Sequence, residues 1–563
     1  MTAIEDLYVS AANRFLHSVV VVDDRARLTP EDDDADEVEA DLEDPSPFAG
    51  LPLSGTKPPE LGSGANEGSD AAPRPDSGPS SQDAPDPEDP PPDPEDGTAD
   101  ENRLDAGLLI ETFARLGMVC SAIRPEGAAS DVERLVARAA SRCDIVTVDW
   151  HLATPDDHGA KALAVVNELS SEQDDGRLRL LAVYTGDPRG DQIEAALIGL
   201  SRTARLGPLL FQRNSTRIVI LFKENTRLPA HSTGEIVTVV DLPQRLIREF
   251  ARLCEGIVPA TAMTALGAVR GNLHEILSVL HGGHDRAFLG HRLAQDNPDD
   301  ATEHLIELIV SEVRSVIDED AETARVAGHE ALMLWLQDRE ESELAVSTQT
   351  IETLSLRGGS KIVRNELGNS DADYLPKKKW HPTALLASGD RLQADDLNAR
   401  LAERMTVRHL YMRSSPRRLE LGVLIADADR HYWVCIQPLC DSVRLEKATA
   451  RVPLLPCRAS EDKAKFDLVL SADDEILQLA LRPHPSEIEV VEFAVTPTTK
   501  DVGATFVEGE WRFTSKSRGA YMYVSQLKPD QAQRIVQDLG TTASRVGLNE
   551  SEWLRRKTRG EPT

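Results

Sequence analysis

The spacing of apolar and polar positions divides the chain into regions of different periodicity. Between residues 17 and 256, short apolar runs of strand length alternate with segments whose apolar residues recur at helical spacing. Five strands that alternate with five helices are typical of a parallel sheet covered on both faces, so we predict a doubly wound α/β domain over residues 1–256. The predicted strands are 17–24, 118–123, 144–150, 178–187 and 215–225, and the predicted helices are 105–117, 130–141, 159–170, 191–204 and 241–256.

Three further regions follow this domain. Residues 257–345 continue at helical spacing and predict an α-helical region. Residues 346–404 are polar, and we interpret them as an irregular linker. From about residue 405 the apolar positions alternate or form runs of strand length, separated by Pro, Gly, Asp and Ser. This pattern predicts a small β-rich domain over residues 405–563, with a terminal helix at PDQAQRIVQDLG.

The charge of the chain is concentrated in one stretch. The 563 residues carry a formal net charge of −33, and residues 31–100 alone hold 22 Asp and Glu against Lys57 and Arg74. The same stretch contains 14 of the 34 prolines and too few large apolar residues to form a core. We therefore predict that residues 30–102 are a disordered acidic insertion in the first domain.

Composition also excludes several classes of protein. An acidic chain is a poor non-specific ligand for nucleic acid, and we expect no DNA binding. The chain has no run of about 18 apolar residues and no signal-peptide pattern, so we expect a cytoplasmic protein without membrane association. The six cysteines read as reduced thiols rather than a disulfide scaffold. A metal cluster of Cys435, Cys440 and Cys457 is the weaker alternative, because their spacing lacks a CxxC pair.

Polar side chains stand where the predicted parallel strands end. Asp23 and Asp24 end the first strand, Asp149 the third, Thr185 the fourth and Lys223 the fifth. Because the carboxyl ends of parallel strands share one edge, these side chains should line one pocket. Three neighbouring carboxylates repel one another and need a cation, and oxygen ligands of this kind suit Mg²⁺.

Such a pocket suits an incoming phosphoryl group. Mg²⁺ and the lysine would stabilise the charge on its oxygens, while an aspartate oxygen attacks phosphorus and forms an acyl phosphate. The threonine hydroxyl could then bond a phosphoryl oxygen and carry the change to the surface.

This constellation resembles the receiver domain of two-component response regulators over roughly residues 14–256, and DWHLATPDDHG (149–159) resembles the loop that follows the phosphoacceptor. The resemblance implies a flavodoxin-like five-stranded parallel sheet and a partner histidine kinase. It also implies roles for single residues: Asp149 as phosphoacceptor, Asp23, Asp24 and the His151 backbone carbonyl with Asp149 as Mg²⁺ ligands, Thr185 as switch hydroxyl and Lys223 as phosphoryl-binding lysine.

The sequence departs from the receiver pattern at its output surface. Ile220 stands where receivers often carry an aromatic switch residue, and Glu224 replaces the usual proline after Lys223. The acidic insertion follows the first strand, and we hypothesise that it slows the access of anionic phosphodonors.

Segments outside the first domain carry a second resemblance. VPATAMTALGAVRGNLHEIL, DRAFLGHRLAQDNPDDATEH and YWVCIQPLCDSVRL resemble the receiver-bearing regulators of bacterial conflict systems, in particular of the Detocs anti-phage defence system. That resemblance implies a regulator that works with a histidine kinase and a receiver-fused effector, through protein contacts or as a phosphate sink. We expect no enzymatic activity beyond autophosphorylation and slow autodephosphorylation. A non-defence signalling regulator and a phosphate-independent scaffold are the alternatives.

Other polar groups have ordinary interpretations beside functional ones. His274 lies in NLHEIL, where a surface or half-buried histidine competes with a phosphotransfer role. His281, His284 and His291 could bind a metal, but the intervening glycines favour a turn between helices. KKKWH at 377–381 fits a solvated loop or a docking patch. An enzymatic C-terminal domain lacks support, because it has no P-loop and no HExxH motif.

Overall fold

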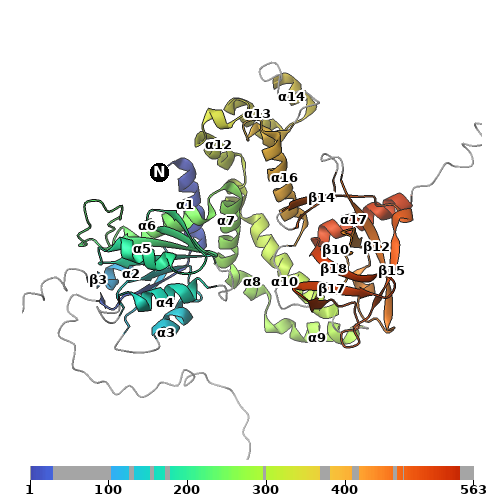
Figure 1. Ribbon diagram of the computed structural model, residues 1–563, viewed down its shortest axis with the longest axis horizontal. Coiled ribbons are helices and arrows are strands. Elements are labelled where there is room, and N and C mark those ends of the chain that lie inside the picture. Colours follow the sequence, from blue (N-terminus) through green and yellow to red (C-terminus); the bar gives the residue numbers. More distant parts are fainter. Residues whose placement is uncertain are drawn as a thin grey trace, which may run out of the picture. The chain divides into compact units, whose positions relative to one another are not determined.

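The computed structural model divides the chain into two compact units, Met1–Asp338 (unit 1) and Arg339–Thr563 (unit 2) (Figure 1). The predicted acidic insertion and residues 377–380 of the basic patch lie outside the described residues. No described helix is long and apolar enough to cross a membrane. The structure describes residues 2–28, 103–125, 132–152, 158–171, 178–295, 300–367, 381–408, 417–460, 466–472 and 475–544.

A mostly parallel sheet forms the centre of unit 1. Its strand order is β4-β1-β5-β6-β9-β8-β7, and the first five strands in this order pair in parallel. These five are the predicted strands. The strands of this sheet are β1 (Ser18–Val22), β4 (Val119–Ile123), β5 (Ile145–Val148), β6 (Arg179–Thr185), β7 (Thr203–Gly207), β8 (Leu210–Arg213) and β9 (Thr216–Phe222).

The predicted number of five strands is wrong, because the described part of this sheet has seven. The predicted helix over 191–204 ends early, at Ile198, and the chain then forms the antiparallel pair β7 and β8 beside β9. Two residues with positive φ, Leu209 and Asn214, stand at the turns before and after β8. These turns fold the chain back onto the sheet edge, where the sequence had suggested a helix and a loop.

Helices cover both faces of the sheet because the strand side chains alternate. Val19 and Val21 of β1 pack on one side with α1, α2 and α6, whereas Val20 and Val22 pack on the other with α3, α4 and α5. The sheet is therefore mostly parallel with helices on both faces. The helices are α1 (Ala3–Phe15), α2 (Ala106–Arg115), α3 (Val132–Ala140), α4 (Ala160–Leu169), α5 (Gly190–Ile198) and α6 (Leu242–Ala251).

The predicted helical region follows as α7 to α12. Helix α7 packs against α1, α10 and α11 and shares the core of the sheet through Ala260 and Met263. Unit 1 therefore joins the α/β domain and this region into one body. The helices are α7 (Ile257–Gly271), α8 (Leu273–Val279), α9 (Asp285–Ala294), α10 (Asp300–Glu319), α11 (Ala321–Val326) and α12 (His329–Gln337).

Unit 2 begins with helices where we predicted an irregular linker over 346–404. Their short apolar segments are separated by glycines, a proline and polar residues, so the sequence shows no long helical period. Ser347 and Asp390 cap two of them through side-chain oxygens that accept backbone N–H groups. The helices are α13 (Thr348–Arg357), α14 (Lys361–Leu367), α15 (Pro382–Leu385) and α16 (Arg391–Thr406).

The rest of unit 2 is the predicted antiparallel β domain, and it contains a closed barrel. The strands β11, β10, β18, β17, β15 and β12 pair in this order, and β12 also pairs with β11. Helix α17 (Pro529–Ala543) follows, as predicted. The strands are β10 (Val423–Ala426), β11 (Tyr432–Cys435), β12 (Thr449–Ala459), β13 (Leu468–Ala472), β14 (Glu475–Leu481), β15 (Glu489–Ala494), β16 (Thr505–Val507), β17 (Glu510–Ser515) and β18 (Gly519–Gln526).

Candidate functional site

The carboxyl edge of the parallel sheet gathers the predicted residues. Asp23 follows the last residue of β1, Asp149 follows β5, Thr185 ends β6 and Lys223 follows β9. Because β1, β5, β6 and β9 run in parallel and are fully paired up to these ends, their side chains emerge beside one another. Asp24 lies next to Asp23, and its carboxylate is within reach of the same pocket.

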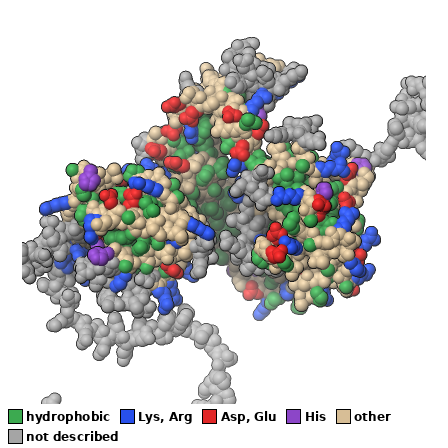
Figure 2. All heavy atoms as spheres, in the orientation of Figure 1, with side chains coloured by type: hydrophobic (Ala, Val, Ile, Leu, Met, Phe, Trp, Pro, Cys, Tyr) green, Lys and Arg blue, Asp and Glu red, His purple; other side chains and the backbone are tan. Residues whose placement is uncertain are grey.

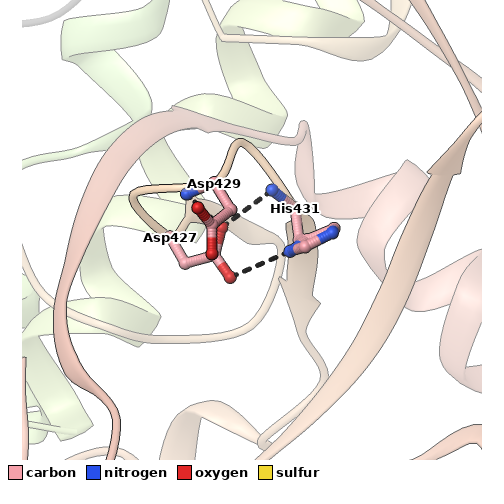
Figure 3. A group of neighbouring side chains, drawn as sticks. All are labelled: Asp427, Asp429 and His431. Atoms are coloured by element: carbon pink, nitrogen blue, oxygen red, sulfur yellow. Dashed lines mark hydrogen bonds and ion pairs between the residues drawn. The ribbon is translucent and has the colours of Figure 1, made fainter.

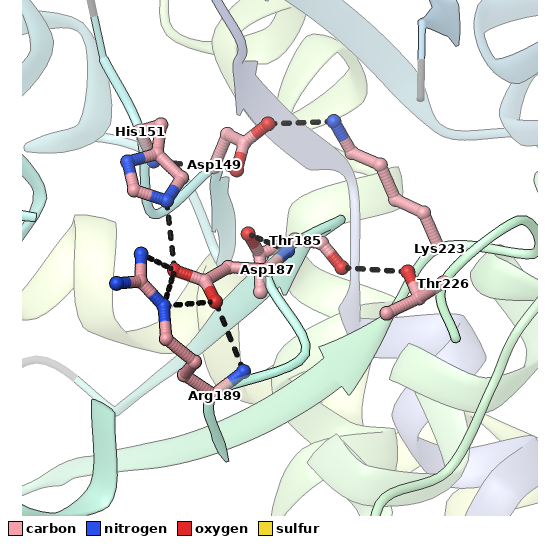
Figure 4. Close-up of polar contacts among 7 residues, drawn as sticks. All are labelled: Asp149, His151, Thr185, Asp187, Arg189, Lys223 and Thr226. Atoms are coloured by element: carbon pink, nitrogen blue, oxygen red, sulfur yellow. Dashed lines mark hydrogen bonds and ion pairs between the residues drawn. The ribbon is translucent and has the colours of Figure 1, made fainter. Parts of the chain in front are cut away.

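Lys223 joins two of the carboxylates. Its Nζ donates to Oδ2 of Asp23 at 2.7 Å and to Oδ2 of Asp149 at 2.6 Å (Figure 4 shows the bond to Asp149). The lysine is only 3% exposed, and Asp23 and Asp149 are buried as well. A buried lysine of this kind is stable only where carboxylates compensate its charge, so the three groups form one electrostatic unit.

Asp23 and Asp149 share the charge of Lys223. Burial raises the pKa of Asp23 to about 6, with Lys223 opposing the shift and Asp149 adding to it. Burial lowers the pKa of Lys223, but the two carboxylates outweigh this effect, so that its pKa lies above the ordinary value. The lysine therefore stays charged.

The geometry of the carboxylates fits a divalent cation. One oxygen each from Asp23, Asp24 and Asp149 lies within 4.8 Å of the other two. Hard oxygen donors in this arrangement are the ligands that Mg²⁺ takes in proteins, and a cation would lower the cost of burying Asp23 as an anion. These three side chains would hold the ion; the part assigned to the His151 carbonyl stays a prediction.

A cavity of about 340 Å³ opens beside this cluster. Its wall includes Asp24, Asp149, His151 and Thr185, so it unites predicted residues from three strand ends. The size of the cavity admits a phosphoryl group together with part of its donor.

A second polar cluster, which was not predicted from the sequence, lies on the wall of this cavity. The Oδ2 of Asp187 lies 2.8 Å from Nε2 of His151 and accepts a bond of 2.7 Å from the Arg189 guanidinium (Figure 4). Burial raises the pKa of Asp187, but its bonds to His151 and Arg189 prevail and hold it far below the ordinary value. The bond to Asp187 raises the pKa of His151. The backbone N–H of Asp187 also donates to the Thr185 hydroxyl at 3.1 Å, which orients that side chain.

The signal for this cluster was present in YTGDPR, at the end of β6. Asp187 is the last residue of the strand predicted over 178–187, whereas β6 ends at Thr185, so that Asp187 belongs to the loop whose turn brings it to His151.

A comparison with known protein families gave a match, and it covers the region that contains this site. Residues 15–228 match the family model of the response receiver domain. The matched span includes all six predicted site residues, and unit 1 therefore contains a receiver domain. No curated protein and no solved structure gave a match to the chain. Receiver domains work with histidine kinases and hold Mg²⁺ at an acidic cluster, which is the kind of cluster found here.

A second group that could hold a metal lies in unit 2, outside the receiver domain. Asp427, Asp429 and His431 are neighbours in the turn between β10 and β11 (Figure 3). The Asp427 carboxylate accepts the backbone N–H groups of Asp429 at 3.0 Å and His431 at 2.9 Å. These bonds stabilise the tight turn and are a sufficient reason for an aspartate at position 427.

The remaining histidine predictions concern unit 1. His274 is exposed on α8, and Gly282–His284 form a helical turn between α8 and α9, as the glycines indicated. His291 instead lies beside His304 of α10, with Nε2 and Nδ1 3.0 Å apart. Neither arrangement adds a group to the receiver cavity.

Proposed function

We propose that this protein is a response regulator that accepts a phosphoryl group on Asp149 in a Mg²⁺-dependent pocket. The observation that carries the proposal is the buried Asp23–Lys223–Asp149 cluster, with the Asp24 carboxylate within reach, in a receiver domain. A purely structural lysine would not need two buried carboxylates, with a third beside them, since one partner satisfies its charge.

Each residue has a part in the transfer. An Asp149 oxygen attacks phosphorus of a phosphohistidine; the P–N bond breaks, and its electron pair goes to the ring nitrogen, which takes up a proton. Lys223 is positioned to compensate the charge of the phosphoryl oxygens, and Thr185 can donate its hydroxyl to one of them. The Mg²⁺ held by Asp23, Asp24 and Asp149 would supply further charge stabilisation at the same oxygens.

The partners follow from the same chemistry. We propose a histidine kinase as phosphodonor, and an output through protein contacts or as a phosphate sink. The closed barrel of unit 2 is our candidate for the surface that makes these contacts, and we expect no DNA binding because the chain is acidic overall. The resemblance of residues 258–277, 285–304 and 432–445 to regulators of the Detocs system supports a role in anti-phage defence beside a receiver-fused effector.

The test is labelling by a small phosphodonor such as acetyl phosphate, read by phosphate-affinity gel and intact mass. Wild type should take up one phosphoryl group with Mg²⁺ and none with a chelator. Asp149→Asn should abolish labelling, because the amide is not a nucleophile. Asp191→Asn, at an exposed position at the start of α5, is the matched control and should label normally. Failure of wild type to label would favour a scaffold, and labelling of Asp149→Asn would mean that another residue accepts the group.

A further inference from the structure

The helices that follow the receiver domain carry large apolar side chains at the surface of unit 1. On the face drawn in Figure 2, hydrophobic side chains gather over α7 and its neighbours, where Val258 and Leu266 are exposed. The longest of these helices, α10, has Ala301 as its only buried residue. A helix of 20 residues with an apolar surface normally gains its stability by packing. The exposed apolar side of α10 is therefore a candidate surface for a further partner.

Most of the exposed apolar residues of α10 form one stripe, whereas Leu308, 45% exposed, lies on the opposite side of the helix. Ile306, Ile309 and Val310 are 54%, 41% and 53% exposed, and the half-buried Val313 and Ile317 continue the row. Residues spaced by three and four positions share one face of a helix. This is the spacing of helices that pair along their length, and it extends over three turns.

The contacts of α10 inside unit 1 use another side of the helix. It packs against α7 and α9, and the half-buried Leu305 and Val316 lie with Ala301 on that side. At 3.6 residues per turn, the middle of the stripe is about a quarter turn away from this contact. The stripe is therefore additional to the packing that fixes α10 in its unit.

Charged residues border the stripe in a self-complementary order. Glu303 and Arg314 lie along the same edge, eleven residues or about three turns apart. Arg314 contacts Asp318 at 3.4 Å in an exposed pair on its own helix, and such pairs contribute little. The Arg314 guanidinium can therefore leave Asp318 at little cost and pair with a carboxylate of another molecule.

We propose that α10 pairs with α10 of a second copy of this chain, antiparallel and about a two-fold axis near Val310. Ile306 of each copy then packs near Val313 of the other, and Glu303 of each reaches Arg314 of the other. A parallel pair would instead set the flank that carries Glu303 and Arg314 of one copy on the side opposite to that of the other copy, so the attraction between them would be lost. The antiparallel pair is isologous, so it closes as a dimer.

The first test is the mass of the full chain in solution, by sedimentation over a range of concentrations. Wild type should be a dimer that dissociates on dilution. Ile306→Asp, at a position that tolerates a polar residue in the monomer, should be monomeric throughout. Ser311→Asp, on the exposed polar side of the same helix, should remain dimeric. A wild type that is always monomeric would overturn the proposal and assign the stripe to unit 2 or to another protein; a dimeric Ile306→Asp variant would overturn it too.

The second test concerns orientation. Glu303→Arg and Arg314→Glu should each raise the dimer dissociation constant about tenfold, since each replaces two attractions with two repulsions. The double variant should restore it to within about threefold of wild type. A double variant as weak as the single ones would overturn the antiparallel register. Labelling of Asp149 on the same proteins reports on the receiver pocket separately, because α10 contributes no residue to it.

Discussion

At the scale of single residues, Lys223 stabilises the receiver pocket, because its ammonium group compensates the charge of buried carboxylates. The Lys223 ammonium is shared by Asp23 and Asp149. The same two carboxylates belong to the set that would bind Mg²⁺. Lysine and metal therefore stabilise the same negative charge, and each should compensate in part for the loss of the other.

This relation predicts the behaviour of Lys223→Met. Without Mg²⁺, the variant should lose about 3–5 kcal/mol of unfolding free energy, because it leaves buried carboxylates without a counter-charge. Millimolar Mg²⁺ should stabilise the variant more than it stabilises wild type. Urea unfolding with and without the metal measures both effects. Arg115→Met, which removes an exposed ion pair with Glu111, should cost less than about 1 kcal/mol and respond to Mg²⁺ as wild type does. Equal metal responses of Lys223→Met and wild type would contradict the argument.

The ion pair between Arg14 and Asp320 predicts a pH dependence of stability. The Arg14 guanidinium donates to Oδ1 and Oδ2 of Asp320 at 2.5 and 3.0 Å, and the Thr323 N–H donates to Oδ2 at 2.8 Å. Burial raises the pKa of Asp320, but these bonds outweigh it and leave the pKa below its ordinary value of 3.8. A carboxyl with a lowered pKa stabilises the fold above the ordinary value, and this stability is lost as the pH falls through the folded-state pKa.

Asp320→Asn should therefore lower the unfolding free energy by about 1–3 kcal/mol at neutral pH, and the difference from wild type should shrink as the pH falls below about 4. Urea midpoints between pH 3 and 7 measure it. Asp318→Asn, at an exposed position on α10, should have little effect. A difference that is constant with pH would show that charge is not the cause.

Strand-end positions made the main site predictable from sequence. Each strand is a continuous apolar run, so its last residue marks the sheet edge without any three-dimensional information. Asp187 and Arg189 could not be found this way, because their contacts with His151 depend on how the loop after β6 turns. The tertiary path of a loop, rather than its residue types, decides whether its side chains enter the pocket.

At the scale of elements, the same limit explains the errors in the fold. Apolar periodicity located the five parallel strands and the helices between them. It failed for β7 and β8, which are short, half-exposed and separated by a tight turn at Leu209. It also failed for α13 to α16, which bury few apolar residues; the 16-residue α16 buries only Ala394 and Ala399. Elements that owe their stability to caps and turns leave a weaker period than elements buried in a core.

The packing of α1 on α7 gives a prediction at this scale. A Cβ added to Gly267 of α7 would lie 2.8 Å from the backbone oxygen of Arg14 in α1, whereas one added to Gly271 would meet nothing within 4 Å. Gly267→Ala should destabilise unit 1 by about 1–3 kcal/mol, because the two helices must separate. Gly271→Ala, the matched control in the same helix, should stabilise it by up to about 1 kcal/mol. Thermal unfolding of both variants measures the contrast, and similar melting temperatures would show that the contact is not tight.

At the scale of the whole molecule, the acidic insertion carries most of the net negative charge of the chain. Residues 31–100 carry 22 acidic residues, and the two ends of the insertion are held together by the parallel pair β2 (Ala26–Arg27) and β3 (Leu104–Asp105). This pair begins two residues after Asp24. Since the two described ends of the insertion start near Asp24, we hypothesise that its sequence charge of about −20 opposes the entry of an anionic phosphodonor.

Deletion of residues 31–100 should consequently raise the initial rate of labelling by acetyl phosphate about three- to tenfold at low ionic strength. Strand β2 stays paired with β3, since the remaining linker is long enough to join adjacent ends, so the pocket should keep its shape. Salt screens exposed charges beyond about 10 Å at 0.1 M, and the difference from wild type should shrink as salt is added. A second variant with Asn and Gln in place of the 22 acidic residues keeps the length of the insertion and removes its charge. If charge is the cause, this variant should match the deletion; if bulk is the cause, it should match wild type. Equal rates for all three proteins at low salt would show that the insertion does not control access to Asp149.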